Sequence, residues 1–154
     1  MTITKAKLLV VDDDHSVLAS LKKLLEAKNY EVHPARNAAE ALEQFKANRI
    51  DLVILDIKLG GENGWQVFQD MTVTNPFVPT IIITAEWGQR ERAAALGVEG
   101  LIEKPIDVPV FLEMIRDLLA ESTAEKHQRI LGSKEYCRYV TGTEKLHLQR
   151  SRER

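Results

Sequence analysis

Short, uninterrupted apolar runs constrain the fold of this chain more than any other feature of its sequence. The clearest are Leu8–Val11, Leu52–Leu55, Ile81–Ile83 and Leu101–Ile102. Because polar residues do not alternate within them, the corresponding strands are predicted to be buried on both faces. Amphipathic stretches with helical spacing separate the runs. This alternation predicts an α/β fold, with a parallel sheet between layers of helices.

A weaker strand and five helices complete the predicted pattern. The weaker strand is expected at Tyr30–His33 and is predicted to end at Pro34. The helices are expected over residues 16–27, 38–45, 65–72, 87–96 and 108–119. Asp14, Asn37 and Asp107 precede three of them and are predicted N-caps, since their side chains can accept hydrogen bonds from the first turn. Asp14 is therefore interpreted as a cap.

Composition and charge narrow the class of protein. The chain has 154 residues, 44% of them hydrophobic and 29% charged, which is typical of a globular protein with one sizeable core. The net charge is −2, so the chain as a whole does not resemble a nucleic-acid binder. Residues 121–154 hold eight Lys/Arg against five Asp/Glu, and this weak excess does not change that expectation.

The cellular compartment is predicted from absences in the sequence. Cys137 is the one cysteine, so an intramolecular disulfide is excluded and a reducing compartment is expected. No apolar run approaches the roughly 20 residues that span a bilayer. The first residues, MTITKAK, lack the apolar core of a signal peptide. We therefore expect a cytoplasmic protein with no membrane partner.

Polar side chains stand at the C-terminal ends of the predicted strands. Asp12–Asp14 follow the first run, Asp56 the third strand, Thr84 the fourth and Lys104 the fifth. In a parallel sheet these ends lie at one edge, where such folds place their chemistry. Crowded carboxylates suit a hard cation such as Mg²⁺, and one carboxylate can act as a nucleophile toward phosphorus. A hydroxyl and an ammonium can then contact phosphoryl oxygens.

These motifs resemble the receiver domain of two-component response regulators over residues 5–120. The matching segments are LLVVDDD, DLVILDIKLGGENG, TIIITA and LIEKP. The resemblance implies a flavodoxin-like architecture, a five-stranded parallel sheet of order 2-1-3-4-5 with helices on both faces. It also implies a receiver domain at residues 1–121. Residues 122–154 would then be a linker or partner-binding extension with no recognisable output domain, or part of a longer protein.

The resemblance implies a phosphoacceptor and a metal site. Asp56 matches the aspartate that accepts the phosphoryl group. Asp12 and Asp13 match the acidic pair that holds Mg²⁺ together with Asp56, Asp13 directly and Asp12 through water. Lys58 matches the position whose backbone carbonyl completes the coordination. Mn²⁺ is the alternative ion.

The resemblance also implies roles for residues near the last two strands of the receiver. Thr84 matches the switch hydroxyl that moves toward the phosphoryl group. Lys104 matches the lysine that contacts it, and the Lys104–Pro105 bond is expected to be cis. Gly64 matches the glycine that ends the loop after the phosphoacceptor.

Two positions depart from the usual pattern of the family. Gly60 stands where proline is common, and with Gly61 beside it the loop is expected to be more flexible. Leu101 stands where tyrosine or phenylalanine is common. The usual coupling between the threonine and an aromatic ring is therefore in question.

The extension has its own predicted structure. Residues 121–130 are expected to continue the last helix as far as Gly132. Tyr136–Val140 and Lys145–Leu148 flank a Thr-Gly-Thr sequence and are predicted to form a hairpin.

The predicted function is a signalling protein rather than an enzyme. Its phosphoryl donor would be a histidine kinase or a phosphotransfer protein, and phosphorylation would switch binding to an output partner or a homodimer. One alternative is a phosphatase similar to the haloacid dehalogenases, whose strand-one Asp-x-Asp pattern is loosely matched by Asp12 and Asp14. That class gives Asp56 no role. A second alternative is a receiver-like module that binds partners without phosphorylation.

Overall fold

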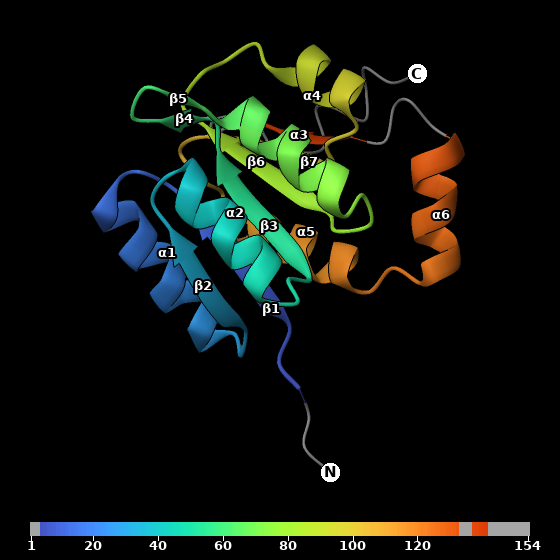
Figure 1. Cartoon of the computed structure of the whole chain (residues 1–154), viewed down its shortest axis with the longest axis horizontal. Helices are drawn as coiled ribbons and strands as arrows, with labels where there is room; N and C mark the ends of the chain where they lie inside the picture. Colours follow the sequence, from blue (N-terminus) through green and yellow to red (C-terminus); the bar gives the residue numbers. More distant parts are fainter. Residues whose placement is uncertain (1–3, 133–136, 142–154) are drawn as a thin grey trace. The chain divides into compact units, whose positions relative to one another are not determined.

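The computed structural model describes residues 4–132 and 137–141. The chain divides into two compact units, Met1–Thr80 and Ile81–Arg154. Figure 1 labels most of the elements of both units.

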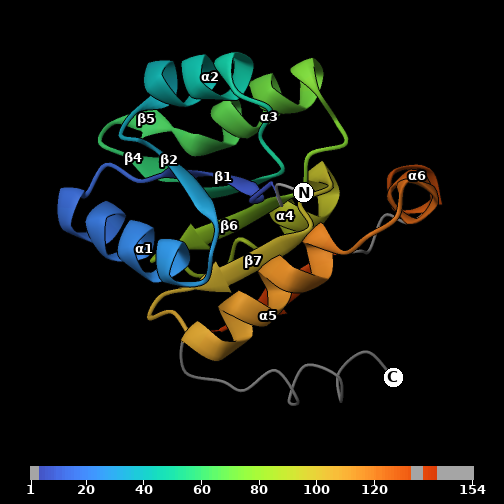
Figure 2. The same ribbon diagram turned by 90° about the horizontal axis from the view of Figure 1, so that it is seen from below.

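The first unit has three parallel strands in the order β2-β1-β3. They are β1 (Lys7–Val11), β2 (Glu31–Ala35) and β3 (Leu52–Asp56). Figure 2 shows α1 on one face of these strands and α2 and α3 together on the other. The helices are α1 (His15–Ala27), α2 (Ala38–Ala47) and α3 (Gly64–Thr74). Coverage on both faces buries Leu8–Val11 and Leu52–Leu55, as their uninterrupted apolar character predicted.

The predicted N-caps of this unit are confirmed. Asp14 caps α1, where its Oδ1 accepts hydrogen bonds from the backbone N–H of Ser16 at 2.9 Å and of Val17 at 3.2 Å. Asn37 caps α2 by accepting from the N–H of Glu40 at 2.9 Å. The cap that was predicted from residue type therefore sets where each helix begins.

The predicted end of the second strand was wrong. Pro34 lies inside β2, opposite Val10, and the strand continues to Ala35. Among the described residues of the first unit, β2 pairs only with β1, so the missing N–H of Pro34 can face away from the ladder. A proline is tolerated in such a position.

A small hairpin follows β3. It consists of β4 (Lys58–Leu59) and β5 (Glu62–Asn63), which pair antiparallel. Gly60 and Gly61 form its two-residue turn with φ of 55° and 98°. Two consecutive positive φ values suit a tight hairpin turn and strongly favour glycine. They also exclude proline, whose φ is held near −65°, and this explains the departure at Gly60.

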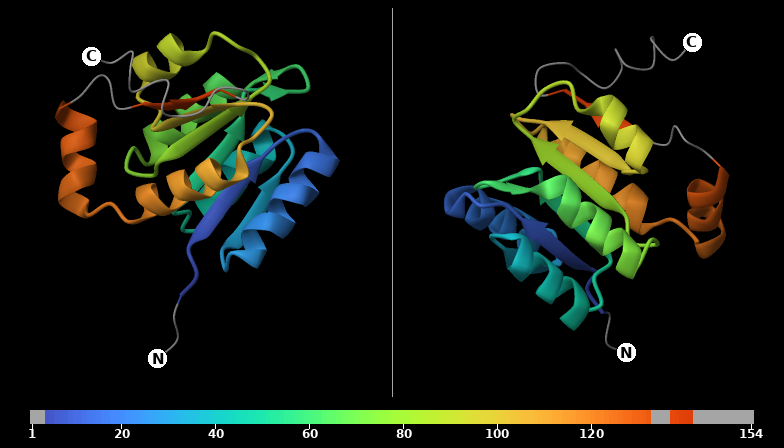
Figure 3. Two further views of the ribbon diagram at one scale, coloured as in Figure 1. Left: turned by 180° about the vertical axis from the view of Figure 1, so that it is seen from behind. Right: turned by 45° about the horizontal axis from the view of Figure 1, so that its top comes forward.

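The second unit contains three further parallel strands in the order β6-β7-β8. They are β6 (Thr80–Thr84), β7 (Gly100–Glu103) and β8 (Arg138–Val140). Figure 3 shows α4 (Arg90–Leu96) and α5 (Val108–Leu119) on opposite faces of β6 and β7. Asp107 caps α5, as predicted, by accepting from the N–H of Val110 at 3.2 Å. With β8 included, the described residues form six parallel strands, one more than expected.

The segment after α5 differs from its prediction. Helix α5 ends at Leu119, and a separate helix, α6, covers Thr123–Gly132. Strand β8 pairs parallel with β7. The predicted hairpin of this segment with Lys145–Leu148 stays a prediction, because Lys145–Leu148 lie outside the described residues. Parallel neighbours need a crossover, and α6 lies in that connection.

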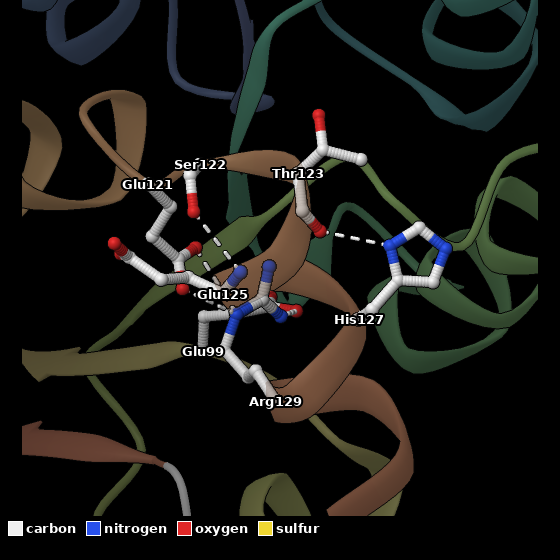
Figure 4. Close-up of polar contacts among 7 residues, drawn as sticks. All are labelled: Glu99, Glu121, Ser122, Thr123, Glu125, His127 and Arg129. Atoms are coloured by element: carbon white, nitrogen blue, oxygen red, sulfur yellow. Dashed lines mark hydrogen bonds and ion pairs between the residues drawn. The ribbon is translucent and has the colours of Figure 1, made fainter.

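Helix α6 is anchored by charge. Figure 4 shows the Arg129 guanidinium between the carboxylates of Glu99 and Glu121. Arg129 Nε donates to both oxygens of Glu121 at 3.1 and 3.0 Å, and Nη1 donates to Glu99 Oε1. All three side chains are at least nine-tenths buried, and the two carboxylates raise the pKa of Arg129 against the opposing effect of burial. This triad fixes α6 to the start of β7.

Candidate functional site

Asp12 stands directly after β1 and is held by backbone hydrogen bonds. Its N–H donates to the carbonyl of Ala35 at 3.1 Å, and its Oδ1 accepts from the N–H of Asp14 at 2.9 Å. The residue is 3% exposed. The carboxylate is therefore held in place at the carboxyl end of the strand.

Asp56 is the last residue of β3 and is 7% exposed. Its Oδ1 accepts from the N–H of Lys58 at 3.0 Å, where the chain turns into the β4–β5 hairpin. The predicted role of the Lys58 carbonyl stays a prediction, while the Lys58 N–H contributes this bond to Asp56.

Gly64 packs against the backbone that carries Asp56. A Cβ at this position would lie 2.5 Å from the Cα of Ile57 and 2.8 Å from the carbonyl oxygen of Asp56. The Gly64 N–H also donates to the Ile57 carbonyl at 2.9 Å. Because the neighbours are backbone atoms that cannot turn aside, only glycine lets α3 start so close to the end of β3.

The three predicted metal ligands of the first unit come together. Carboxylate oxygens of Asp12, Asp13 and Asp56 all lie within 4.8 Å of one another. Asp12 and Asp56 are buried, and Asp13 is exposed. Oxygen donors in this number, with one ligand open to solvent, fit Mg²⁺ or Mn²⁺. Asp14 is not in this group and serves as the cap of α1, as interpreted from the sequence.

The hairpin turn also lies against this cluster. A Cβ at Gly60 would be 3.2 Å from Oδ2 of Asp13. A residue larger than glycine would therefore crowd the exposed carboxylate of the cluster. The glycine at position 60 serves both the turn and the space beside Asp13.

Thr84 and Lys104 come together in the second unit. Thr84 ends β6, is fully buried, and accepts a hydrogen bond at Oγ1 from the N–H of Glu86 at 2.9 Å. The Lys104 N–H donates to the Thr84 carbonyl at 2.8 Å. Both residues thus stand at the carboxyl ends of adjacent parallel strands. The Lys104–Pro105 bond is cis, as the family resemblance implied.

Two residues near Lys104 were not identified from the sequence. Glu103 ends β7 and is 2% exposed, and its Oε1 accepts from the hydroxyl of Tyr139 at 2.6 Å. Tyr139 lies in register with Leu101, the position where the family commonly has tyrosine or phenylalanine. An aromatic ring from β8 therefore lies beside the leucine that replaces the usual aromatic residue. A local pattern could not reveal this contact, because it joins residues 36 positions apart.

Within the described part of the chain, no helix is long and apolar enough to span a membrane.

A parallel sheet with helices on both faces is the architecture of a flavodoxin-like domain. The response regulator receiver domain family matches residues 8–116, which is more than half of the chain. The chain belongs to this family, the receivers of two-component signalling. The predicted architecture is thereby confirmed, with β8 as an additional strand.

Curated relatives are longer than this chain. The transcriptional regulatory protein GlrR of Escherichia coli K12 is 33% identical over 131 residues, covering 84% of this chain and 30% of that protein. The response regulator MprA of Mycobacterium sp. strain KMS is 32% identical over 122 residues, covering 78% of this chain and 53% of that protein. The chain thus spans about a third to a half of these relatives.

Solved receiver structures share the fold. A CheY-like receiver domain protein from Methanospirillum hungatei JF-1 is 28% identical with a TM-score of 0.72, covering 81% of this chain and 98% of that one. TrrA of Thermotoga maritima, solved in complex with Mg²⁺ and BeF, is 29% identical with a TM-score of 0.68, covering 73% of this chain and 98% of that one.

Proposed function

We propose that this protein accepts a phosphoryl group on Asp56, with a divalent cation held by Asp12, Asp13 and Asp56. The observation that supports this most directly is the convergence of the three carboxylates within 4.8 Å. Like charges at this spacing repel unless a cation accompanies them. When bound, the cation would neutralise the carboxylates and the phosphoryl oxygens. The Lys58 carbonyl is the proposed fourth protein ligand.

Asp56 is the proposed nucleophile. One of its oxygens would form a bond to phosphorus while the phosphorus–nitrogen bond of a phosphohistidine donor breaks, and the released imidazole nitrogen takes up a proton. The hydrogen bond from the Lys58 N–H to Oδ1 holds the carboxylate in one orientation during this exchange. Little covalent chemistry is needed beyond such positioning.

Thr84 and Lys104 have proposed roles in recognising the product. The Thr84 hydroxyl would donate to a phosphoryl oxygen, and the Lys104 ammonium would pair with phosphoryl charge. Their main-chain hydrogen bond supports a joint role, because it ties the ends of β6 and β7 together.

The wider setting is also proposed. The donor would be a histidine kinase or phosphotransfer protein, and the phosphorylated form would bind a different partner or a second copy. Residues 1–121 would act as the receiver and 122–154 as its extension. The cytoplasmic location stays a prediction.

Acetyl phosphate tests the proposal. With Mg²⁺ present, intact mass spectrometry should show one added phosphoryl group, and chelation of the metal should prevent it. Asp56→Asn should abolish labelling. Asp51→Asn is the matched control, because Asp51 precedes the same strand and bonds the Lys7 N–H at 2.8 Å, an interaction that an amide oxygen can retain. Labelling of Asp56→Asn at the wild-type rate would refute the assignment.

The phosphatase alternative predicts a different result. A haloacid-dehalogenase-type enzyme would turn over p-nitrophenyl phosphate many times, and the Asp56→Asn variant would keep this activity. A receiver-like module without phosphorylation would show neither labelling nor turnover.

A further inference from the structure

Strand β8 brings the C-terminal extension onto the edge of β7. Leu101 pairs with Tyr139 and Ile102 with Val140, and the Arg138 N–H donates to the Glu99 carbonyl at 3.0 Å. Figure 3 shows β8 alongside β7 in the left view. The extension is therefore part of the sheet of the second unit.

The side chain of Tyr139 contacts two other elements. Its hydroxyl donates to Glu103 Oε1 on β7 at 2.6 Å. The guanidinium of Arg90 on α4 lies 5.4 Å from the centre of its ring, within the range of a cation–π contact. Tyr139 thus joins the extension to a strand and to a helix of the receiver.

Glu103 depends on this contact. The residue is 2% exposed, and its second oxygen, Oε2, has no hydrogen-bond partner among the described residues. A buried carboxylate with few partners is costly, and loss of the tyrosine hydroxyl would remove the hydrogen bond that Glu103 Oε1 accepts. The position of the Glu103 side chain, and of the β7 end that carries it, therefore depends on the docking of Tyr139.

Lys104 follows Glu103 directly. The Lys104 N–H donates to the Thr84 carbonyl at 2.8 Å, and Thr84 and Glu103 are partners in the β6–β7 register. A continuous set of bonds thus runs from the hydroxyl of Tyr139 through Glu103 to the backbone of Lys104. Every member lies in the second unit.

We propose that Tyr139 is a positioning residue, which acts through Glu103 to hold Lys104 where it can meet a phosphoryl group. The inference rests on the proposed function. A group held in place before reaction loses less freedom when it binds its target, so docking of β8 favours phosphorylation. Coupling between sites is reciprocal, so phosphorylation also favours docking of β8. The extension is thereby linked to the phosphoryl site through a single side chain.

Amide hydrogen exchange of residues 138–140 in the full chain measures the docking of β8. Beryllium fluoride with Mg²⁺ serves as the phosphoryl mimic, and labelling of Asp56 by acetyl phosphate is measured separately. In the wild type, the mimic should slow exchange of β8 by at least about fivefold, the lower range of typical allosteric coupling. Tyr139→Phe keeps the ring but removes the hydroxyl. In this variant the mimic should change the amide exchange of β8 by less than about twofold, and acetyl phosphate should label Asp56 about fivefold more slowly than in the wild type.

Two further variants separate positioning from simple stabilisation. Glu103→Gln keeps an acceptor oxygen for Tyr139 and should retain the effect of the mimic. Tyr30→Phe is the matched control, because it makes the same substitution in the first unit and should behave as the wild type. A merely structural tyrosine would raise exchange with and without the mimic by the same factor.

The outcomes distinguish the two proposals. If Asp56 is labelled but the mimic leaves β8 exchange unchanged or speeds it, the inference is wrong while the proposed function stands. Retained coupling in Tyr139→Phe, or its loss in Glu103→Gln, would also overturn the inference. Absence of labelling in the wild type would overturn the proposed function and this inference with it.

Discussion

Cys137, the one cysteine of the chain, should react slowly with iodoacetamide in the folded protein. It directly precedes β8. Burial raises the pKa of its thiol from 9.0 to about 12, with a further increase from the charge of Glu99 and an opposing effect of Arg90. Only the thiolate attacks the reagent, so the raised pKa makes the thiol unreactive at ordinary pH.

The magnitude follows from the two pKa values. At pH 8, a thiol of pKa 9.0 is about one-tenth ionised, whereas one of pKa about 12 is ionised in roughly one molecule in ten thousand. Alkylation should therefore be about a thousandfold slower in the folded protein than in the protein unfolded by urea. The folded rate should also rise about tenfold for each pH unit between 8 and 10.

Timed alkylation followed by intact mass spectrometry gives both rates, and a single added group is expected because there is one thiol. The folded state holds the thiol proton more tightly than the unfolded state. The Cys137 thiol therefore adds to the free energy of unfolding below about pH 9, and this contribution is lost as the pH rises toward 12. A folded rate at pH 8 within about tenfold of the unfolded rate would refute the half-buried placement of Cys137 before β8.

Three further substitutions test the site. Gly64→Ala places a Cβ 2.5 Å from the Cα of Ile57, and urea unfolding should show a loss of about 1–3 kcal/mol or more; a loss below about 0.5 kcal/mol would contradict the packing. Asp13→Ala should weaken Mg²⁺ binding in calorimetric titration more than Asp12→Ala, because a direct carboxylate ligand contributes more than a water-mediated one; equal affinities would refute this division. Lys104→Ala should leave Mg²⁺ affinity nearly unchanged but shorten the lifetime of the phosphorylated form, and a large loss of affinity would show a different role for the lysine.

Local signals were sufficient to predict the core of the receiver. The runs Leu8–Val11 and Leu52–Leu55 are buried strands because only a sheet covered on both faces accommodates them. Helix starts at Asp14 and Asn37 followed from side chains that bond the first turn. The carboxylate cluster was predicted because strand ends in parallel folds share an edge, and the structure brings its three members together.

Other features could not be predicted because they depend on long-range pairing. Strand β2 can continue through Pro34 only if the proline nitrogen faces the side of the strand that has no partner strand. Local sequence does not reveal which side that is. Strand β8 has three residues, too few for a clear period, and its partner β7 lies across the connection that contains α6. The contact of Tyr139 with Glu103 exists only because of that pairing.

The way α6 is attached shows why an apolar pattern could not reveal the docking of the extension. Among the residues of α6 whose side chains the structure describes, Arg129 is the buried one, while Ile130 is 40% and Leu131 82% exposed. A buried ion pair contributes less net stability than its charges suggest, because both ions lose hydration, yet it has one good geometry. Arg138 adds a more exposed ion pair with Asp117 at 2.7 Å, and the Tyr139 hydroxyl adds a hydrogen bond to Glu103. These polar contacts act together with the β7–β8 pairing and the buried Val140 to hold the extension in one geometry. If Lys104 meets a phosphoryl group as proposed, an extension held in this way is suited to a docking equilibrium that phosphorylation can shift.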